Sequence, residues 1–173
     1  GGARLSADDI GSYKIILQNS TGDIEASRES IPGGTVSFTS IKPGSYTVLV
    51  EGYESDSVTK YLISKGSSSV QVVGGQTAKA TITMKSLGLI FVKGVNTEFS
   101  LVDGELEGTQ TEDTLKWGNP SDSNSGESPM NPLASIQSAV EKIISRCKSQ
   151  SEINEYIIYV NGFISPNKIL SPS

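Results

Sequence analysis

The stretch that decides the fold is TVSFTSIKPGSYTVLVEGY, residues 35–53. Apolar and polar residues largely alternate before its Lys-Pro-Gly turn and alternate again after it, which is the period of a half-buried strand. Pro43 suits the first central position of a type II turn, and Gly44 suits the positive φ of the next position. The pattern therefore predicts two strands, residues 36–41 and 46–50, joined by a turn and packed by one face on a core.

Further short patterns surround this pair. They lie at residues 13–17, 24–27, 58–64, 70–73 and 77–84, with 24–27 expected as an edge strand. Residues 66–69 predict a turn between two of these strands, and Gly74-Gly75 predicts a hairpin turn between two others. About seven short strands within roughly 75 residues are typical of a two-sheet sandwich.

The central stretch resembles a known family. Phe38, Ile41, Pro43-Gly44 and Tyr46 are spaced as in the signature of prealbumin-like or carboxypeptidase-regulatory-like β-sandwiches, which include the Cna-B-type repeats of bacterial surface proteins. The resemblance covers roughly residues 12–85, since the closing segment VQVVGGQTAKATITMK is also similar to the last strands of that family. It implies an Ig-like or prealbumin-like sandwich in an exported bacterial protein, but a fold does not by itself assign a function.

The C-terminal half predicts one amphipathic helix and a few strands. Apolar residues recur every three or four positions over residues 132–149, with Pro132 in the first turn and Asn131 as a possible N-cap. Cys147 falls on the apolar stripe, so we expect it to be a small core residue. Strands are expected at residues 87–92, 99–106 and 156–160, and the helix is expected to pack against them.

This helix and strand resemble the opening of bacterial right-handed parallel β-helix proteins, in which an amphipathic helix caps the first rung. The match extends from residue 119 to about residue 164. It implies that residues 87–173 are the truncated N-terminal cap of a solenoid, because a solenoid needs several stacked rungs. The alternative is a small α+β unit. We therefore divide the chain into a flexible lead-in (1–11), a sandwich domain (12–86) and an α+β segment (87–173).

Composition excludes several classes of function. The formal net charge is −5 and no Lys/Arg cluster occurs, so nucleic acid is not an expected partner. The chain has no histidine, which removes the Ser-His-Asp triad and imidazole metal ligands. Its single cysteine excludes an internal disulfide, and no apolar run approaches the ~18 residues of a membrane span. We predict no enzyme activity and no cofactor.

Two clusters of carboxylate residues and one loop are the candidate sites. Asp103, Glu105 and Glu107 alternate as on one strand face, where paired carboxylates suffice for glycoside hydrolysis, but a solvated outer face explains the alternation equally well. Glu51, Glu54 and Asp56 would supply oxygen ligands to calcium, but they lack the dense spacing of a dedicated loop, so no metal site is predicted. The long polar stretch 109–131 is either a solvated ordered loop or a ligand-binding loop. Its candidate residues are Trp117, Asn119, Asp122 and Asn124.

The sequence thus predicts a mainly β protein: a sandwich followed by a small α+β segment with one helix. The expected function is a non-catalytic module of the bacterial cell surface or secretome, acting as a spacer, in adhesion or in ligand display, with a host protein or glycan as partner. One alternative is the accessory front end of a polysaccharide-active β-helix enzyme. Another is an assembly subunit that pairs by strand addition at a sheet edge. The sequence does not set an oligomeric state.

Overall fold

The computed structural model of the chain describes residues 5–54, 59–95, 97–103, 105–149 and 153–164. Within them the chain is mainly β with a single α-helix, which confirms the predicted fold class. The chain divides into two compact units. We call Leu5–Leu87 the sheet unit and Gly88–Ser173 the helix unit, and describe each by itself.

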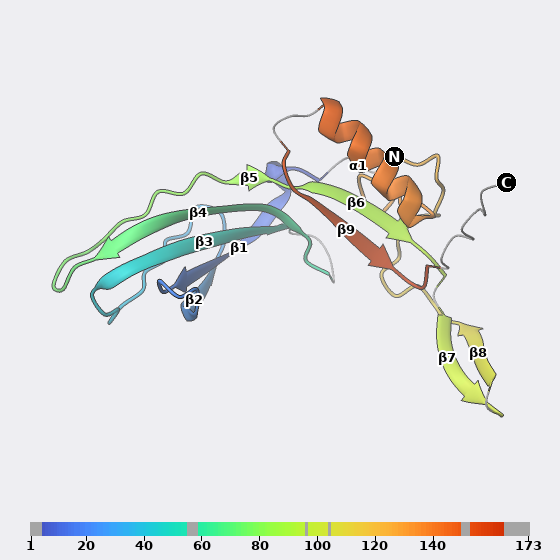
Figure 1. The fold of residues 1–173 in the computed structure, drawn as a ribbon, viewed down its shortest axis with the longest axis horizontal. Coiled ribbons are helices and arrows are strands. Elements are labelled where there is room, and N and C mark those ends of the chain that lie inside the picture. The colour runs from blue at the N-terminus through green and yellow to red at the C-terminus, as the bar shows by residue number, and fades with distance from the viewer. Residues whose placement is uncertain (1–4, 55–58, 96, 104, 150–152, 165–173) are drawn as a thin grey trace. The chain divides into compact units, whose positions relative to one another are not determined.

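The sheet unit is one antiparallel sheet of five strands in the order β2-β1-β3-β4-β5, after a short 3₁₀ helix, η1 (Ala7–Asp9) (Figure 1). The predicted edge strand at residues 24–27 is confirmed, because β2 lies at one border of the sheet. An antiparallel sheet is the part of the sandwich prediction that the structure confirms. The strands are β1 (Ile10–Gln18), β2 (Ile24–Ser30), β3 (Gly44–Glu54), β4 (Leu62–Val72) and β5 (Lys85–Ser86).

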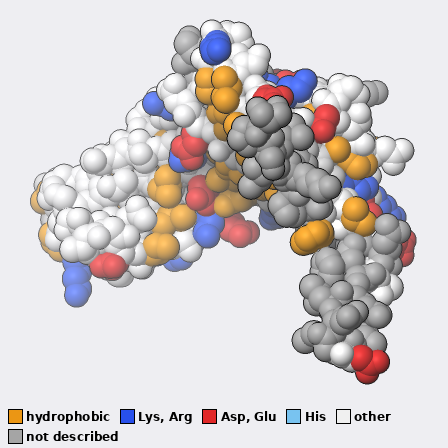
Figure 2. Space-filling view, turned by 45° about the vertical axis from the view of Figure 1, so that its right-hand side comes forward, with side chains coloured by type: hydrophobic (Ala, Val, Ile, Leu, Met, Phe, Trp, Pro, Cys, Tyr) orange, Lys and Arg blue, Asp and Glu red, His pale blue; other side chains and the backbone are white. Residues whose placement is uncertain are grey.

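The two faces of this sheet differ in character because side chains alternate along each strand. One face carries the directly opposed pair Leu17 and Val48, both buried. The other face carries a row of alternating charges opposed across four strands, since Lys14 pairs with both Glu29 and Glu51, and Glu51 pairs with Lys65. Opposite charges at directly opposed positions stabilise a sheet. Most of the visible surface of this unit is neither charged nor hydrophobic (Figure 2).

Two segments predicted as strands form no ladder. Residues 36–41 and 77–84 are not strands, although their apolar residues Phe38 and Ile82 are half-buried. The predicted type II turn is also wrong: Gly44 is extended and pairs with Val72 as the first residue of β3, and the positive φ lies at Ser40 (60°). The alternation of apolar and polar residues indicates only that one side of the segment is buried. A segment can bury one side without forming hydrogen bonds to a neighbouring strand.

Strand β4 runs through the turn predicted at residues 66–69. A Cβ on Gly66 would collide with the carbonyl oxygen of Thr83, so this glycine allows a close approach of backbone rather than a reversal of the chain. At the second predicted position a turn is present, because Gly75 has a φ of 75° and the Gln76 N–H donates to the Val73 carbonyl at 3.1 Å, but it does not join two strands, since residues 77–84 form none.

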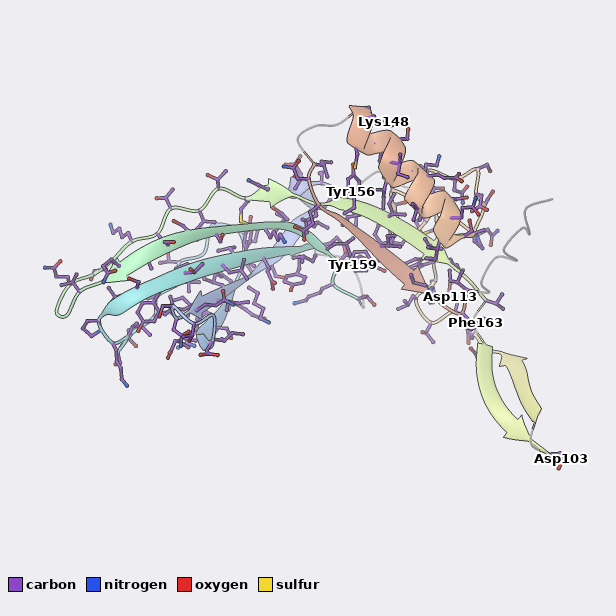
Figure 3. All side chains as sticks on the ribbon, viewed as in Figure 1. Asp103, Asp113, Lys148, Tyr156, Tyr159 and Phe163 are labelled. Atoms are coloured by element: carbon purple, nitrogen blue, oxygen red, sulfur yellow. The ribbon has the colours of Figure 1, made fainter. Side chains whose placement is uncertain are left out.

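The helix unit is built on a parallel pair of strands, β6 (Gly88–Lys93) and β9 (Tyr156–Asn161), which run in register over six residues. This confirms the strands predicted at 87–92 and 156–160. The strand predicted at 99–106 is instead a hairpin of β7 (Thr97–Val102) and β8 (Glu105–Gln110). Asp103, with a φ of 52°, lies at its tip (Figure 3).

β6 is buried on both faces, as is typical of a strand in a parallel sheet. On one face Ile90 and Val92 pack with Leu133 and with Ala139 of the helix α1 (Ile136–Ser149). On the other face the Phe91 ring lies between Trp117, edge-on at 5.3 Å between centroids, and Tyr159, stacked at 5.4 Å. No described helix is long and apolar enough to cross a bilayer.

The helix begins four residues later than predicted. Ser135 is its N-cap, since the Ser135 hydroxyl accepts the Ser138 N–H at 3.2 Å. The prediction that Cys147 is a core residue is wrong, because Cys147 is exposed. The apolar arc of the helix is wider than the surface that covers it: Ala139 is buried, whereas Ile136, Val140 and Ile144 are exposed.

Candidate functional site

The four loop residues predicted to bind a ligand divide into a buried one and three that lie together. Trp117 is 7 % exposed and is directed into the core against Phe91. The Asn124 amide donates to the carbonyls of Asn119 (2.9 Å) and Pro132 (2.8 Å). Asp122 accepts from the Ala134 N–H (3.1 Å) and the Ser135 hydroxyl (3.0 Å). These contacts order the loop and join it to the start of α1, and a ligand here stays a prediction.

Beside this loop lies an ion pair that sequence reasoning missed. The Lys93 ammonium lies 2.6 Å from the Asp113 carboxylate and also donates to the carbonyls of Trp117 (2.9 Å) and Gly118 (3.2 Å). Asp113 further accepts from the Asn161 amide (3.0 Å) and the Trp117 N–H (3.0 Å). The network therefore joins β6, β9 and the loop.

The ionised form of Asp113 is strongly favoured. Burial raises its pKa, but hydrogen bonds from Lys93 and Asn161, the charge of Lys93 and the Leu115 N–H outweigh burial and lower the pKa to about 2. With the lysine donating to three oxygens, both partners are satisfied as ions. The ion pair therefore suits a structural role, holding the loop against β6 and β9. It does not suit proton transfer near neutral pH, which needs a pKa closer to 7.

The two carboxylate groups of the sequence are not assembled into sites. Glu51 and Glu54 lie on opposite faces of β3, and the Tyr53 hydroxyl donates to Glu51 at 2.7 Å. Asp56, the third member of that group, lies outside the described residues. Asp103 lies in a turn, not on a strand face with Glu105 and Glu107, whose side chains are also outside the description. No three metal-ligating side chains gather anywhere in the described part of the chain.

A groove in the sheet unit is the candidate site that the geometry supports. It encloses about 550 Å³, and a smaller hollow of about 230 Å³ shares Ser12, Glu29 and Lys60 with it. The groove is lined by Gly11, Ser12, Glu29, Ser30, Ile31, Glu54 and Lys60, and the hollow adds Tyr13, Lys14 and Tyr53. Both volumes are open, and together they fall in the range of small-molecule sites.

A β-bulge shapes this groove. β1 carries one extra residue, Gly11, because Ile10 pairs with Glu54 while Ser12 pairs with Tyr53. A bulge bends and twists its strand and re-aims neighbouring side chains. Tyr13 then lies over Gly52, where an added Cβ would lie 3.4 Å from the ring. Strands β1, β2 and β3 thereby bring hydroxyl, carboxylate and phenol groups to one end of the sheet.

The charges of this site balance. Glu29 and Glu54 supply two carboxylates, Lys14 and Lys60 supply two ammonium groups, and Glu54 is almost fully buried at 8 % exposure. Serine hydroxyls and the tyrosine rings add donors, acceptors and apolar faces. Such a lining suits a neutral ligand rich in hydroxyl groups better than a polyanion or a polycation. Sequence reasoning missed it because the strand register, which brings these residues together, is not visible in the sequence.

Comparison of the chain with protein-family models, with curated proteins and with solved structures found no match.

Proposed function

We propose that this chain is a non-catalytic module of a secreted or surface-exposed bacterial protein, and that its groove displays a binding site for a neutral glycan. The observation that carries the proposal is the charge-balanced groove at the end of β1, β2 and β3, with its serine hydroxyls and tyrosine rings. The Ser-, Thr- and Gly-rich composition and the resemblance of residues 12–85 to prealbumin-like sandwiches support a bacterial surface or secreted location.

The physical case for a glycan rests on the mixture of groups. A sugar offers hydroxyls that both donate and accept, so it pairs with carboxylates and with ammonium groups alike. Glu29 and Glu54 would accept from sugar hydroxyls, and Lys60 would donate to them. The Tyr53 ring would contact the apolar face of a pyranose. Because the groove is open rather than closed, it suits a segment of a chain more than a small enclosed molecule.

The test is an array of neutral oligosaccharides, followed by calorimetric titration of each glycan that binds. Lys60→Ala and Glu29→Gln should each weaken binding about tenfold or more, since a hydrogen bond to a charged group contributes about 1.5–3 kcal/mol. Lys79→Ala and Glu25→Gln are the matched controls, because both residues are exposed and neither lines the groove. Asn119→Ala should leave glycan binding unchanged if the ligand lies in the groove, and should weaken it if the ligand lies at the predicted loop. The proposal fails if no neutral glycan binds, or if binding is indifferent to both groove variants.

The parallel pairing of β6 with β9 favours a second candidate, the accessory front end of a polysaccharide-active β-helix enzyme. Parallel pairing of strands distant in sequence, with α1 packed on β6, is the arrangement that the β-helix resemblance implies. The reading frame around this segment tests it. Further rungs with acidic catalytic residues after Ser173 would support the enzyme, whereas repeats of the sandwich or an anchoring signal would support the display module.

A further inference from the structure

Two of the border strands in the described sheets, β2 and β9, are protected very differently. An edge strand exposes unpaired backbone N–H and C=O groups, and monomeric proteins commonly block it with charged side chains, proline or bulges. β2, at one border of the sheet unit, carries Glu25, Arg28 and Glu29 within seven residues. β9, at the border of the parallel pair, has the sequence YIIYVN and carries no charge.

The outer edge of β9 has a defined pattern of hydrogen-bonding groups. The carbonyls of Glu155 and Asn161 accept the N–H groups of Gly88 and Gly94, both at 2.8 Å, so the odd-numbered positions turn toward β6. Backbone groups alternate in direction along a strand. Ile158 and Val160 therefore direct N–H and C=O away from β6, and β6 is the one strand that pairs with β9 among the described residues.

The side chains near this edge are also apolar and accessible. Val160 is 50 % exposed, and Val95 and Phe163, which bridge each other just beyond the strands, are 48 % exposed each. Tyr156 and Tyr159 of the same strand (Figure 3) are half-buried, and the Tyr159 ring stacks on Phe91 of β6. An uncharged edge flanked by exposed apolar side chains is the arrangement that strand pairing uses.

We propose that β9 is a self-pairing edge, at which a second copy of this chain adds its own β9 in antiparallel orientation, with the two-fold axis midway between Ile158 and Ile158 of the second copy. Opposed residues in an antiparallel pair share a face of the sheet, so in a two-fold pair one residue must lie directly opposite its own copy. Centring on Ile158 makes all outward-facing positions meet, which centring on a neighbouring residue does not.

This register places compatible side chains opposite one another. Ile158 lies opposite Ile158 of the second copy, Tyr156 opposite Val160, and Ile157 opposite Tyr159. Pairs of aromatic with β-branched residues are among the favourable cross-strand pairs, and no like charges meet. The result is one four-stranded sheet with the order β6-β9-β9-β6. The inference concerns the helix unit alone and is independent of glycan binding in the groove.

Sedimentation of the full chain at increasing concentration tests the assembly. The wild type should form dimers. Val160→Pro should raise the dimer dissociation constant at least about tenfold, because it removes an outward N–H without touching the β6 ladder. Val160→Thr, which keeps the N–H and the β-branched shape, is the matched control and should still dimerise. Val160→Lys, which charges the edge, is a second disruptive variant if Val160→Pro does not fold by its Trp117 fluorescence.

Cross-linking tests the register. In a Cys147→Ser background, Ile158→Cys would place two thiols on opposed Cα atoms about 5.5 Å apart, within the range of a disulfide. Val160→Cys would place them four residue positions, roughly 13 Å, apart. Diamide should therefore give a covalent dimer of Ile158→Cys and not of Val160→Cys. A wild type that stays monomeric, a dimer unaffected by both Val160→Pro and Val160→Lys, or equal cross-linking at the two positions would overturn the proposal.

Discussion

Replacing Asp113 by asparagine should destabilise the helix unit at neutral pH, and the difference from the wild type should shrink in acid. The carboxylate receives the Lys93 ammonium at 2.6 Å and the Asn161 amide at 3.0 Å, so its ionised form is bound far better in the folded chain than in the unfolded one. Asparagine keeps the shape of the side chain but removes the charge. A protonated aspartate resembles it in both respects.

The magnitude follows from the pKa of Asp113, which is about 2 in the folded chain against 3.8 for an unperturbed aspartate. A difference of about 1.8 pKa units corresponds to about 2 kcal/mol of stability, at 1.36 kcal/mol for each unit. Because the folded pKa is the lower one, this contribution is complete above the unfolded pKa and is lost as the pH falls through the folded pKa. About half should be gone by pH 3 and most of it by pH 2.

Urea unfolding followed by the fluorescence of Trp117, the single tryptophan of the chain, measures this effect in the helix unit. Taking the difference between wild type and Asp113→Asn at each pH cancels the titration of the other carboxyl groups. Glu112→Gln, at an exposed neighbouring position, is the control and should differ from the wild type little at any pH. A difference between wild type and Asp113→Asn that is the same at pH 7 and at pH 2 would refute the reasoning.

Three further substitutions have defined outcomes in the same assay. Gly118→Ala should cost about 1–3 kcal/mol, because its Cβ would collide with the Met130 carbonyl oxygen; a neutral effect would show that this close approach is unnecessary. Ser135→Ala should cost about 1 kcal/mol by removing the N-cap of α1, whereas Ser145→Ala, at an exposed position of the same helix, should not destabilise. Arg146→Met should cost roughly 1–3 kcal/mol, because the guanidinium donates to the Ser125 carbonyl at 2.9 Å and pairs with Glu127 at 3.2 Å; a variant as stable as the wild type would show that the loop is held by other contacts.

The elements that the sequence predicted correctly are those whose pattern leaves few alternatives. Residues 87–92 and 156–160 are short, largely apolar runs, and such runs form strands: β6 is buried on both faces, and β9 is half-buried beside it. The edge strand predicted at 24–27 is bounded by turn residues, and β2, which extends it to Ser30, carries Glu25, Arg28 and Glu29, as an edge strand requires. In each case the local pattern of apolar or charged residues agrees with the place of the strand in its sheet.

The turn at Pro43 and Gly44 fails for the opposite reason. Proline followed by glycine is compatible with a type II turn, but both residues also tolerate extended backbone, and Gly44 takes that option because Val72 offers it a strand partner. The groove is subject to the same limit. Glu29, Glu54 and Lys60 belong to different segments, and only the register of β1 with β2 and β3 makes them neighbours.

The start of α1 shows how a tertiary contact overrides a local signal. Asn131 and Pro132 are good residues for the first turn of a helix, yet the chain delays the helix until Ser135. The reason lies at Leu133, whose N–H donates to the Phe91 carbonyl at 2.8 Å and whose carbonyl accepts the Lys93 N–H at 2.9 Å. Leu133 is thus a one-residue parallel strand on the side of β6 opposite β9, and it buries its whole side chain there. In a helix that began at Pro132, the Leu133 carbonyl would accept from the backbone of the helix itself, and the Lys93 N–H of β6 would lose its acceptor. The pairing with β6 therefore determines where the helix begins.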